Sequence, residues 1–465
     1  MQRLSHFDQA SLRTYIQVVL NFPLKADASA QAIYAHLRTS LTHVGHEFHV
    51  LACKLHLEKS RFAEEAYLGL SKEEIPLVAD IGGANYASLA ARGFPAHEFI
   101  LPEFNLDSLF KLNDGPVPVA HARVKFINGG FLLILSLNNT AADAYGLGQF
   151  VEAFAAATRG LNVAGEPSCT VLDLPQDPKI SSQTLTTLVH GCPEFEVLLE
   201  PNPLPSLPDL LPGGTPSEEI PSEVKIFVFR IDQINKLSDQ VHEALGDQAR
   251  LKRPSAFMII STLTWANVTK ARCGSETGAP PSGDADVAKL FVPLDFRRRF
   301  HEETLEYFGN ANVTIPIEIP VAEVVSATFG GEQNLPAFAK LVNRVRRVID
   351  DVGQADILRR EALIRRLGDC RRLVLSQDRR LPGQLQFNSW RYFGGNDVWS
   401  FPGMGSRKPD AVRRVQNNVS PGSALLLPLT SESEVYELCL ALPKVSMSAL
   451  VQAEEWMHWV DRVID

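Results

Sequence analysis

Residues 128–145 read NGGFLLILSLNNTAADAY, which places a turn, an apolar run and a polar segment in front of a helix. An Asn-Gly dipeptide followed by apolar residues is typical of a β-hairpin, so residues 121–136 are predicted to form two strands. Downstream, apolar residues recur at intervals of three and four, which predicts a helix over residues 145–157. The polar segment NNTAAD is therefore expected to connect a strand to a helix.

Strands and helices alternate on both sides of this segment. Helical spacing or start signals predict helices over residues 29–41 and 255–272, a strand over 225–230, and a helix-rich stretch over 335–367. Such alternation is typical of α/β or α+β layers.

A proline-rich segment separates two halves of similar size. Residues 193–221 contain eight prolines and an adjacent glycine pair, a composition that suits neither a helix interior nor a central strand. We therefore expect an N-terminal domain over residues 1–195, a crossover over 196–224 and a C-terminal domain over 225–465.

Composition excludes several classes of partner. The net charge of -9 and the pI near 5.8 argue against nucleic acid, because binding to a phosphate backbone needs a dense basic surface. The sequence has no apolar run long enough for a membrane span and no signal peptide at its start. These features predict a cytoplasmic globular protein, and a monomer is expected.

No metal or redox site is predicted. The six cysteines are widely separated and form no CxxC pair, which fits reduced thiols. His43, His46 and His49 are three residues apart, but the flanking residues 46–57 (HEFHVLACKLHL) resemble a strand entering the core. On a strand this spacing would send successive histidines to opposite faces.

Seven blocks, spread from end to end, resemble the BAHD acyltransferases, in particular the fungal branch that includes the trichothecene 3-O-acetyltransferases. An ordered series is far more specific than a single motif. The blocks are Leu4-Ser5-His6-Phe7-Asp8, Gly129 to Asp143, Val292-Pro293-Leu294-Asp295-Phe296-Arg297, Tyr307-Phe308-Gly309-Asn310, Asn388-Ser389-Trp390, Ser400 to Gly405 and Lys408 to Arg413.

The resemblance implies two domains related to chloramphenicol acetyltransferase, with a substrate channel at their interface. In that family the acceptor enters from one side and an acyl-CoA from the other. A small, largely apolar metabolite is the expected partner, in specialised metabolism.

Asn139 stands where the family's HxxxD motif has its histidine, and Asp143 stands on the aspartate four positions later. The family histidine takes a proton from the acceptor as the acceptor attacks the thioester, work that suits a pKa near 6.5. A carboxamide cannot accept that proton near neutral pH. Loss of a general base typically costs about two to four orders of magnitude in rate. Asn139 as an ordinary loop residue is the alternative.

Neighbouring positions also depart from the family pattern. Asn138 stands where the fungal branch often has a second histidine, Ala144 replaces a glycine, and Ser400 replaces an aspartate. Asp143 can still pair with Arg297, which the resemblance gives a structural role in holding the active-site loop.

Four further residues are candidates for the substrate pocket. Tyr145 either closes the pocket or packs in the core, and Asn388 and Trp390 lie on a strand that borders the channel in the family. His121 lies on a strand that runs toward Asn139 and is either a substitute base or a buried structural histidine.

These observations favour an enzyme that retains the channel without the acyl-transfer base and catalyses a cyclisation or pericyclic, Diels-Alder-type, reaction without a cofactor. Asn139 would then donate a hydrogen bond to a substrate carbonyl, and the channel would hold the reacting ends together. One alternative is a CoA-dependent O- or N-acyltransferase in which another residue or the substrate supplies the base. A non-catalytic metabolite-binding protein is the other.

Overall fold

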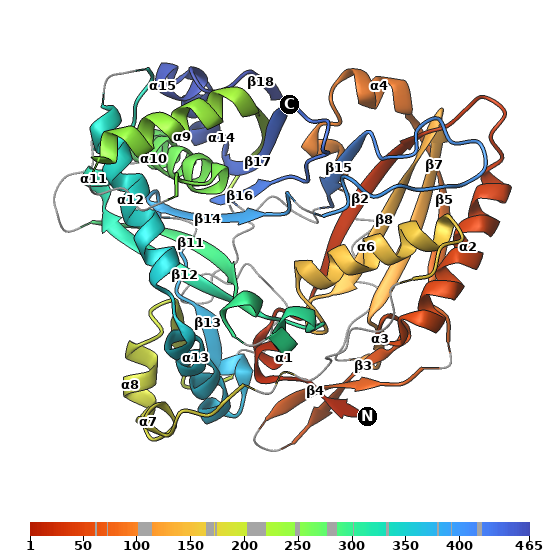
Figure 1. Ribbon diagram of the computed structural model, residues 1–465, viewed down its shortest axis with the longest axis horizontal. Helices are drawn as coiled ribbons and strands as arrows, with labels where there is room; N and C mark the ends of the chain where they lie inside the picture. Colours follow the sequence, from red (N-terminus) through yellow and green to blue (C-terminus); the bar gives the residue numbers. More distant parts are fainter. Residues whose placement is uncertain are drawn as a thin grey trace.

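The computed structural model presents two halves side by side, each built on its own β-sheet with helices packed against it (Figure 1). It describes residues 1–465 apart from 61–62, 72, 101–113, 164–171, 173, 202–219, 247–251, 277–285, 301, 332–333, 379–380, 392 and 416–420.

A five-stranded sheet forms the first half. Its strands, in spatial order, are β15 (Ala411–Arg414), β2 (Tyr15–Pro23), β8 (Gly130–Asn138), β7 (Ala120–Asn128) and β5 (Leu77–Asn85). The predicted β7–β8 hairpin is confirmed, and its turn residue Gly129 has a φ of 80°, which favours glycine.

Two helices cover the face of this sheet that carries the core. They are α2 (Ala30–Glu47) and α6 (Ala144–Thr158), and their buried residues join those of β2, β7 and β8 in one cluster. Both predicted helices are confirmed, and the Ser29 hydroxyl caps α2 by accepting from the N–H of Ala32.

The strand expected over residues 46–57 is wrong up to Cys53 and is confirmed only from Lys54 onward. α2 continues to Glu47 because Leu37, Leu41 and Val44 keep helical spacing and are all buried, and a short α3 (His49–Ala52) follows. The strand of this region starts later, as β3 (Lys54–Lys59).

Smaller elements complete the first half. A four-stranded sheet has the order β1 (Gln2–Arg3), β4 (Glu64–Gly69), β3 and β6 (Val117–Pro118). The short helices are α1 (His6–Ala10), α4 (Tyr86–Ala91) and the 3-10 helix η1 (Ala96–Phe99).

A mixed seven-stranded sheet forms the second half. Its order is β12 (Asn312–Pro320), β11 (Val287–Asp295), β14 (Gln384–Ser389), β16 (Ser423–Leu426), β17 (Val435–Pro443), β10 (Ser222–Arg230) and β18 (Arg462–Ile464). The accompanying helices are α9 (Ile231–Leu245), α10 (Ala256–Glu276), α11 (Val321–Ser326), α12 (Leu335–Asp351), α13 (Gln354–Leu367), α14 (Lys444–Gln452) and α15 (Glu454–Met457). The predicted strand over 225–230 and helix over 255–272 are confirmed by β10 and α10.

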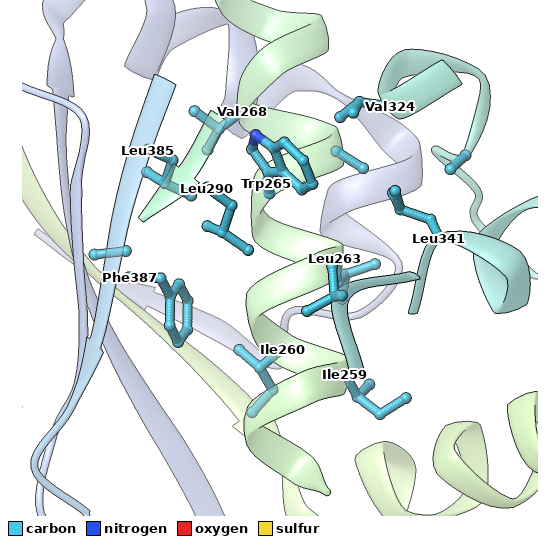
Figure 2. Close-up of a cluster of buried hydrophobic side chains, with 14 of the residues drawn as sticks. Ile259, Ile260, Leu263, Trp265, Val268, Leu290, Val324, Leu341, Leu385 and Phe387 are labelled. Carbon is cyan, nitrogen blue, oxygen red and sulfur yellow. The ribbon is translucent and has the colours of Figure 1, made fainter. Parts of the chain in front are cut away.

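The core of this half surrounds α10. Figure 2 shows Ile260, Leu263 and Trp265 of this helix among side chains of the neighbouring strands and helices. Trp265 is fully buried, and its indole N–H donates to the carbonyl of Gly383 at 3.1 Å. The apolar side of α10 is thus buried, and the one polar atom of Trp265 has a hydrogen-bond partner, as expected for a buried indole.

The chain crosses between the halves more than once. In the chain, β15 lies between β14 and β16 of the second-half sheet, yet it pairs with β2 of the first-half sheet. In the other direction, α7 (Pro178–Ser181), α8 (Leu185–His190) and β9 (Phe195–Val197) pack near α13 and its successor β13 (Leu373–Leu375). The domain boundary at residue 195 stays a prediction, and most of the crossover lies outside the described residues.

Candidate active site

Asn139 follows β8 in a turn held by two distant segments. Its backbone N–H donates to the carbonyl of Thr14 at 2.7 Å, and its carbonyl accepts from the side-chain amide of Asn310 at 2.8 Å. The Asn139 residue is half-buried, and within the described ranges no residue hydrogen-bonds to its carboxamide. That carboxamide therefore has both a donor and an acceptor to offer a small molecule.

Asn138, in contrast, shapes the turn. Its side-chain oxygen accepts from the N–H of Thr140 at 3.0 Å, and its carbonyl accepts from the N–H of Ala141 at 2.9 Å. The residue is buried. An asparagine that bonds to the backbone two residues on is a common turn device, so this position has a local structural explanation.

Asp143 and Arg297 form a buried bidentate ion pair between the two halves. The two guanidinium nitrogens Nη1 and Nη2 each lie 3.0 Å from a carboxylate oxygen of Asp143. Arg297 is only 2% exposed, and it also donates to the carbonyls of Tyr307 and Gly309. Burial opposes the charged guanidinium, yet Asp143 and Asp295 raise the pKa of Arg297 above its usual value.

The Asp143 carboxylate also caps α6. Its Oδ1 accepts from the N–H of Tyr145 at 3.0 Å, and its Oδ2 accepts from the N–H of Ala311 at 3.1 Å. A carboxylate with this many donors is fixed in place and is poorly suited to proton transfer. The arrangement agrees with the structural role that the resemblance implies.

Tyr145 stacks against the same guanidinium. Its ring centroid lies 4.5 Å from the Cζ atom of Arg297, which is a cation–π distance. The side chain is half-buried at the start of α6. Tyr145 thus covers the ion pair, and whether it also closes a pocket stays a prediction.

Asn388 and Trp390 lie at the end of β14 in different surroundings. The Asn388 oxygen accepts from the N–H of Ser389 at 2.7 Å, and the residue is half-buried. Trp390 is 5% exposed in an apolar cluster with residues of both halves, including Ala96 and Val224, and Ala144 packs against this cluster. Trp390 therefore contributes to the core between the halves, and its contact with substrate stays a prediction.

His121 is a buried residue of β7, directly opposite Ser136 of β8. Burial lowers its pKa to about 4, and the nearby positive charge of Arg123 acts in the same direction. At neutral pH the imidazole is therefore uncharged, and it is a much weaker base than a free histidine.

The pH dependence of stability should reveal His121. Its pKa is about 4 in the folded protein and about 6.5 when unfolded, so the unfolded chain binds more protons between these values. The free energy of unfolding should have its full value above about pH 7 and should fall as the pH drops, by roughly 2 to 3 kcal/mol at pH 4.5. The free energy of unfolding, measured with denaturant, should fall less steeply toward acid pH in His121→Asn than in the wild type. If the two proteins lose stability in parallel as the pH falls, groups other than His121 take up the protons.

The block around Ser400 belongs to an aromatic core. Phe401 makes edge contacts with Phe22 and Phe131, with ring centroids 5.2 and 5.0 Å apart. The carbonyl of Ser400 lies 2.8 Å from the Nε2 atom of His36. Its departure from the family pattern thus falls in a packed region of the first half.

One group of residues from the family-like blocks had no role predicted from the sequence. Asp8, Tyr307 and Asn310 form a buried hydrogen-bonded cluster that reaches the carbonyl of Asn139. A local signal was present, because Ser5 and Asp8 have the spacing of a capping box, and the structure contains that box at α1. Tyr307 and Asn310 lie 299 and 302 residues from Asp8, so no local pattern in the sequence connects them to it.

Two cavities border the segment Glu74-Ile75-Pro76, and neither is lined by Asn139. The channel between the halves therefore stays a prediction. In the described part of the chain no helix is both long and apolar enough to cross a membrane. No group of three His, Cys, Asp or Glu residues there is placed to hold a metal ion.

A model described as the Transferase family matches residues 95–457, well over half of the chain. The chain belongs to the Transferase (BAHD) family. A second model, described as the trichothecene 3-O-acetyltransferase-like N-terminal domain, matches residues 14–158 of this transferase. Both matches include the turn from Asn139 to Asp143.

Relatives of this transferase carry the names of acyl-transfer enzymes. It is 25% identical over 350 residues to acyltransferase easC of Emericella nidulans, which covers 70% of this chain and 69% of that protein. It is 23% identical over 365 residues to O-acetyltransferase SAT5 of Stachybotrys chartarum, with 74% and 68% covered.

Solved structures confirm the predicted fold. The complex of F. graminearum TRI101 with coenzyme A and T-2 mycotoxin has a TM-score of 0.79 at 16% identity, covering 100% of this chain and 99% of that one. Vinorine synthase has a TM-score of 0.61 at 17% identity, with 99% and 94% covered. The chain therefore has the two-domain, chloramphenicol-acetyltransferase-like α/β fold.

Proposed function

We propose that this protein is a CoA-dependent acyltransferase of specialised metabolism whose acceptor needs no general base from residue 139. The preferred acceptor is an amine on a small metabolite. The observation that carries the proposal is the half-buried Asn139 carboxamide without a described partner, on a turn whose acyltransferase scaffold is intact.

The retained scaffold supports acyl transfer. Asp143 and Arg297 keep a bidentate buried pair, and the backbone of Asn139 is held at both its N–H and its carbonyl. Relatives named as acyltransferases favour this reaction over the cyclisation or pericyclic reaction that the sequence suggested. None of them carries a name that supports the cyclisation.

The chemistry of a carboxamide selects the acceptor. A hydroxyl group is a weak nucleophile unless a base removes its proton as it attacks, whereas a neutral amine attacks through its free lone pair. Asn139 has no basic atom near neutral pH, but its amide can donate a hydrogen bond to the thioester carbonyl. In a dry site that bond contributes on the order of 1 to 3 kcal/mol as negative charge develops on the oxygen.

In the proposed reaction, the amine nitrogen attacks the carbonyl carbon of the thioester. The new C–N bond forms, the C–S bond breaks, and the CoA sulfur leaves. The proton lost by nitrogen passes to solvent or to the sulfur, so that amide and free CoA thiol are the products. Asn139 orients the carbonyl and moves no proton.

A thiol-release assay tests this proposal. Purified protein is incubated with acetyl-CoA or a longer acyl-CoA and a matched pair of acceptors that differ only in an amine or a hydroxyl group. We expect the amine to release CoA thiol at least about tenfold faster, since only the alcohol needs the missing base. No thiol release with either acceptor would refute the proposal. Conversion of a polyene substrate without CoA would restore the cyclisation hypothesis.

A further inference from the structure

The turn that carries Asn139 is held at both ends by one short segment of the other half. Asn310 donates its side-chain amide to the carbonyl of Asn139 at 2.8 Å, and the carbonyl of Gly309 accepts from the N–H of Asp143 at 3.4 Å. Arg297 fixes that segment in turn, because it donates to the carbonyls of Tyr307 and Gly309. The position of residue 139 therefore depends on Gly309 and Asn310, whose segment Arg297 holds by backbone carbonyls alone.

Asp8 dictates which way the Asn310 amide faces. One carboxylate oxygen of Asp8 accepts from the backbone N–H of Asn310 at 2.7 Å and from its Nδ2 at 3.0 Å. A carboxylate can only accept, and so can the carbonyl of Asn139. Both hydrogens of Nδ2 are thus used, one for each acceptor, and a flipped amide would place its oxygen against two other acceptors.

The second oxygen of Asp8 is anchored as firmly. It accepts from the hydroxyl of Tyr307 at 2.5 Å, and from the hydroxyl and N–H of Ser5 at 2.6 and 3.2 Å. Asp8 is 1% exposed and Asn310 is 2% exposed, so water does not compete for these bonds. The N-terminal capping box of α1 is in this way connected to the backbone of Asn139.

We infer that Asn310, oriented by Asp8, is a positioning residue that fixes the carbonyl of Asn139 and thereby aims its side chain at the reacting thioester. This inference rests on the proposed acyl transfer for its kinetic consequence. Its structural consequence is independent of any reaction, because the bond from Asn310 to Asn139 exists in the protein alone.

Two variants separate positioning from simple stability. Asn310→Ala removes the bond to Asn139 together with a bond to Asp8. Tyr307→Phe removes the bonds of the Tyr307 hydroxyl to Asp8 and Ser5 and leaves the bond from Asn310 to Asn139 in place. For Asn310→Ala we expect kcat to fall at least about tenfold with the KM for acyl-CoA nearly unchanged, the pattern of misplaced groups. For Tyr307→Phe we expect a lower melting temperature and a kcat within about twofold of wild type. Equal losses of kcat in both variants would overturn the inference.

Hydrogen exchange measured by mass spectrometry provides a readout that needs no substrate. Peptides covering residues 139–144 should exchange at least about tenfold faster in Asn310→Ala and at the wild-type rate in Tyr307→Phe. The exchange measurement tests the positioning role of Asn310 even if the protein transfers no acyl group. Unchanged exchange in Asn310→Ala would overturn it while leaving the proposed function intact.

Variants of Asp8 keep the test decisive if Asn310→Ala does not fold. Asp8→Asn retains an acceptor oxygen for Asn310. Its new amide faces the hydroxyls of Ser5 and Tyr307, which can turn to accept, and loses only the bond from the N–H of Ser5. Asp8→Leu has no acceptor. We expect the exchange of residues 139–144 to stay near wild type in Asp8→Asn and to rise in Asp8→Leu. A rise of equal size in both would overturn the inference.

Discussion

Replacement of Asn139 by histidine is expected to raise acyl transfer to an alcohol by about two to four orders of magnitude, the typical contribution of a general base. Imidazole has a pKa near 6.5 and can take the hydroxyl proton as the C–O bond forms. The bonds to Thr14 and Asn310 that hold residue 139 are made by its backbone, so the variant keeps them. Initial rates of CoA thiol release with the alcohol acceptor measure the gain.

Asn138→His is the matched control for this prediction. It adds the same imidazole one residue earlier, but the native side chain there is buried and holds the turn through Thr140. We expect no gain and a lower melting temperature. A folded Asn139→His protein without any gain would mean that the site has lost more than its base.

Arg297→Ala is expected to reduce the free energy of unfolding by about 3 to 5 kcal/mol, because it leaves the buried carboxylate of Asp143 without its cation. The guanidinium is 2% exposed, and the Asp143 side chain is 10% exposed. Two carbonyls of the 307–310 segment lose their donor as well. Equilibrium unfolding in urea, monitored by tryptophan fluorescence, measures the change.

An exposed ion pair supplies the control for this loss. Arg344 lies 2.6 Å from Glu323, with side-chain exposures of 46% and 41%. Removal of Arg344 should cost less than about 1 kcal/mol. The double variant Asp143→Leu with Arg297→Met should lose less than the sum of its single variants, since no unpaired charge remains. Equal effects of Arg297→Ala and Arg344→Ala would contradict the buried pair.

Elements with local signals were predictable from the sequence. The β7–β8 hairpin follows an Asn-Gly dipeptide, α2 begins after a serine cap, and α6 repeats its apolar residues at helical spacing. Each of these signals acts over a few residues, and in these three elements the tertiary packing agrees with it.

Residues 46–53 show where local patterns fail. Residues 46–57 resembled a strand entering the core, but α2 extends to Glu47 because its buried side packs against α6, and β3 begins only at Lys54. Helical stability in proteins comes mostly from burial of one face, which a short window does not display.

The candidate site divides in the same way. Asp143 and Arg297 were expected to pair because the family resemblance implies it, and they lie in contact although 154 residues apart. Asp8 and Asn310 lie in family-like blocks too, yet an amide has no charge to match a carboxylate, and no local spacing connects partners 302 residues apart. Their contact follows only from the packing of α1 against the second half.

The pH dependence of thiol release by the unmodified protein tests the acyl-transfer proposal most directly. An aromatic amine that stays uncharged serves as acceptor, so that only protein groups titrate between about pH 6 and 8. The proposal predicts steady turnover that varies less than about twofold across this range, because a carboxamide does not titrate, and that survives His121→Gln. A rate that rises with an inflection near neutrality, or turnover abolished by His121→Gln, would contradict it by revealing a protein base.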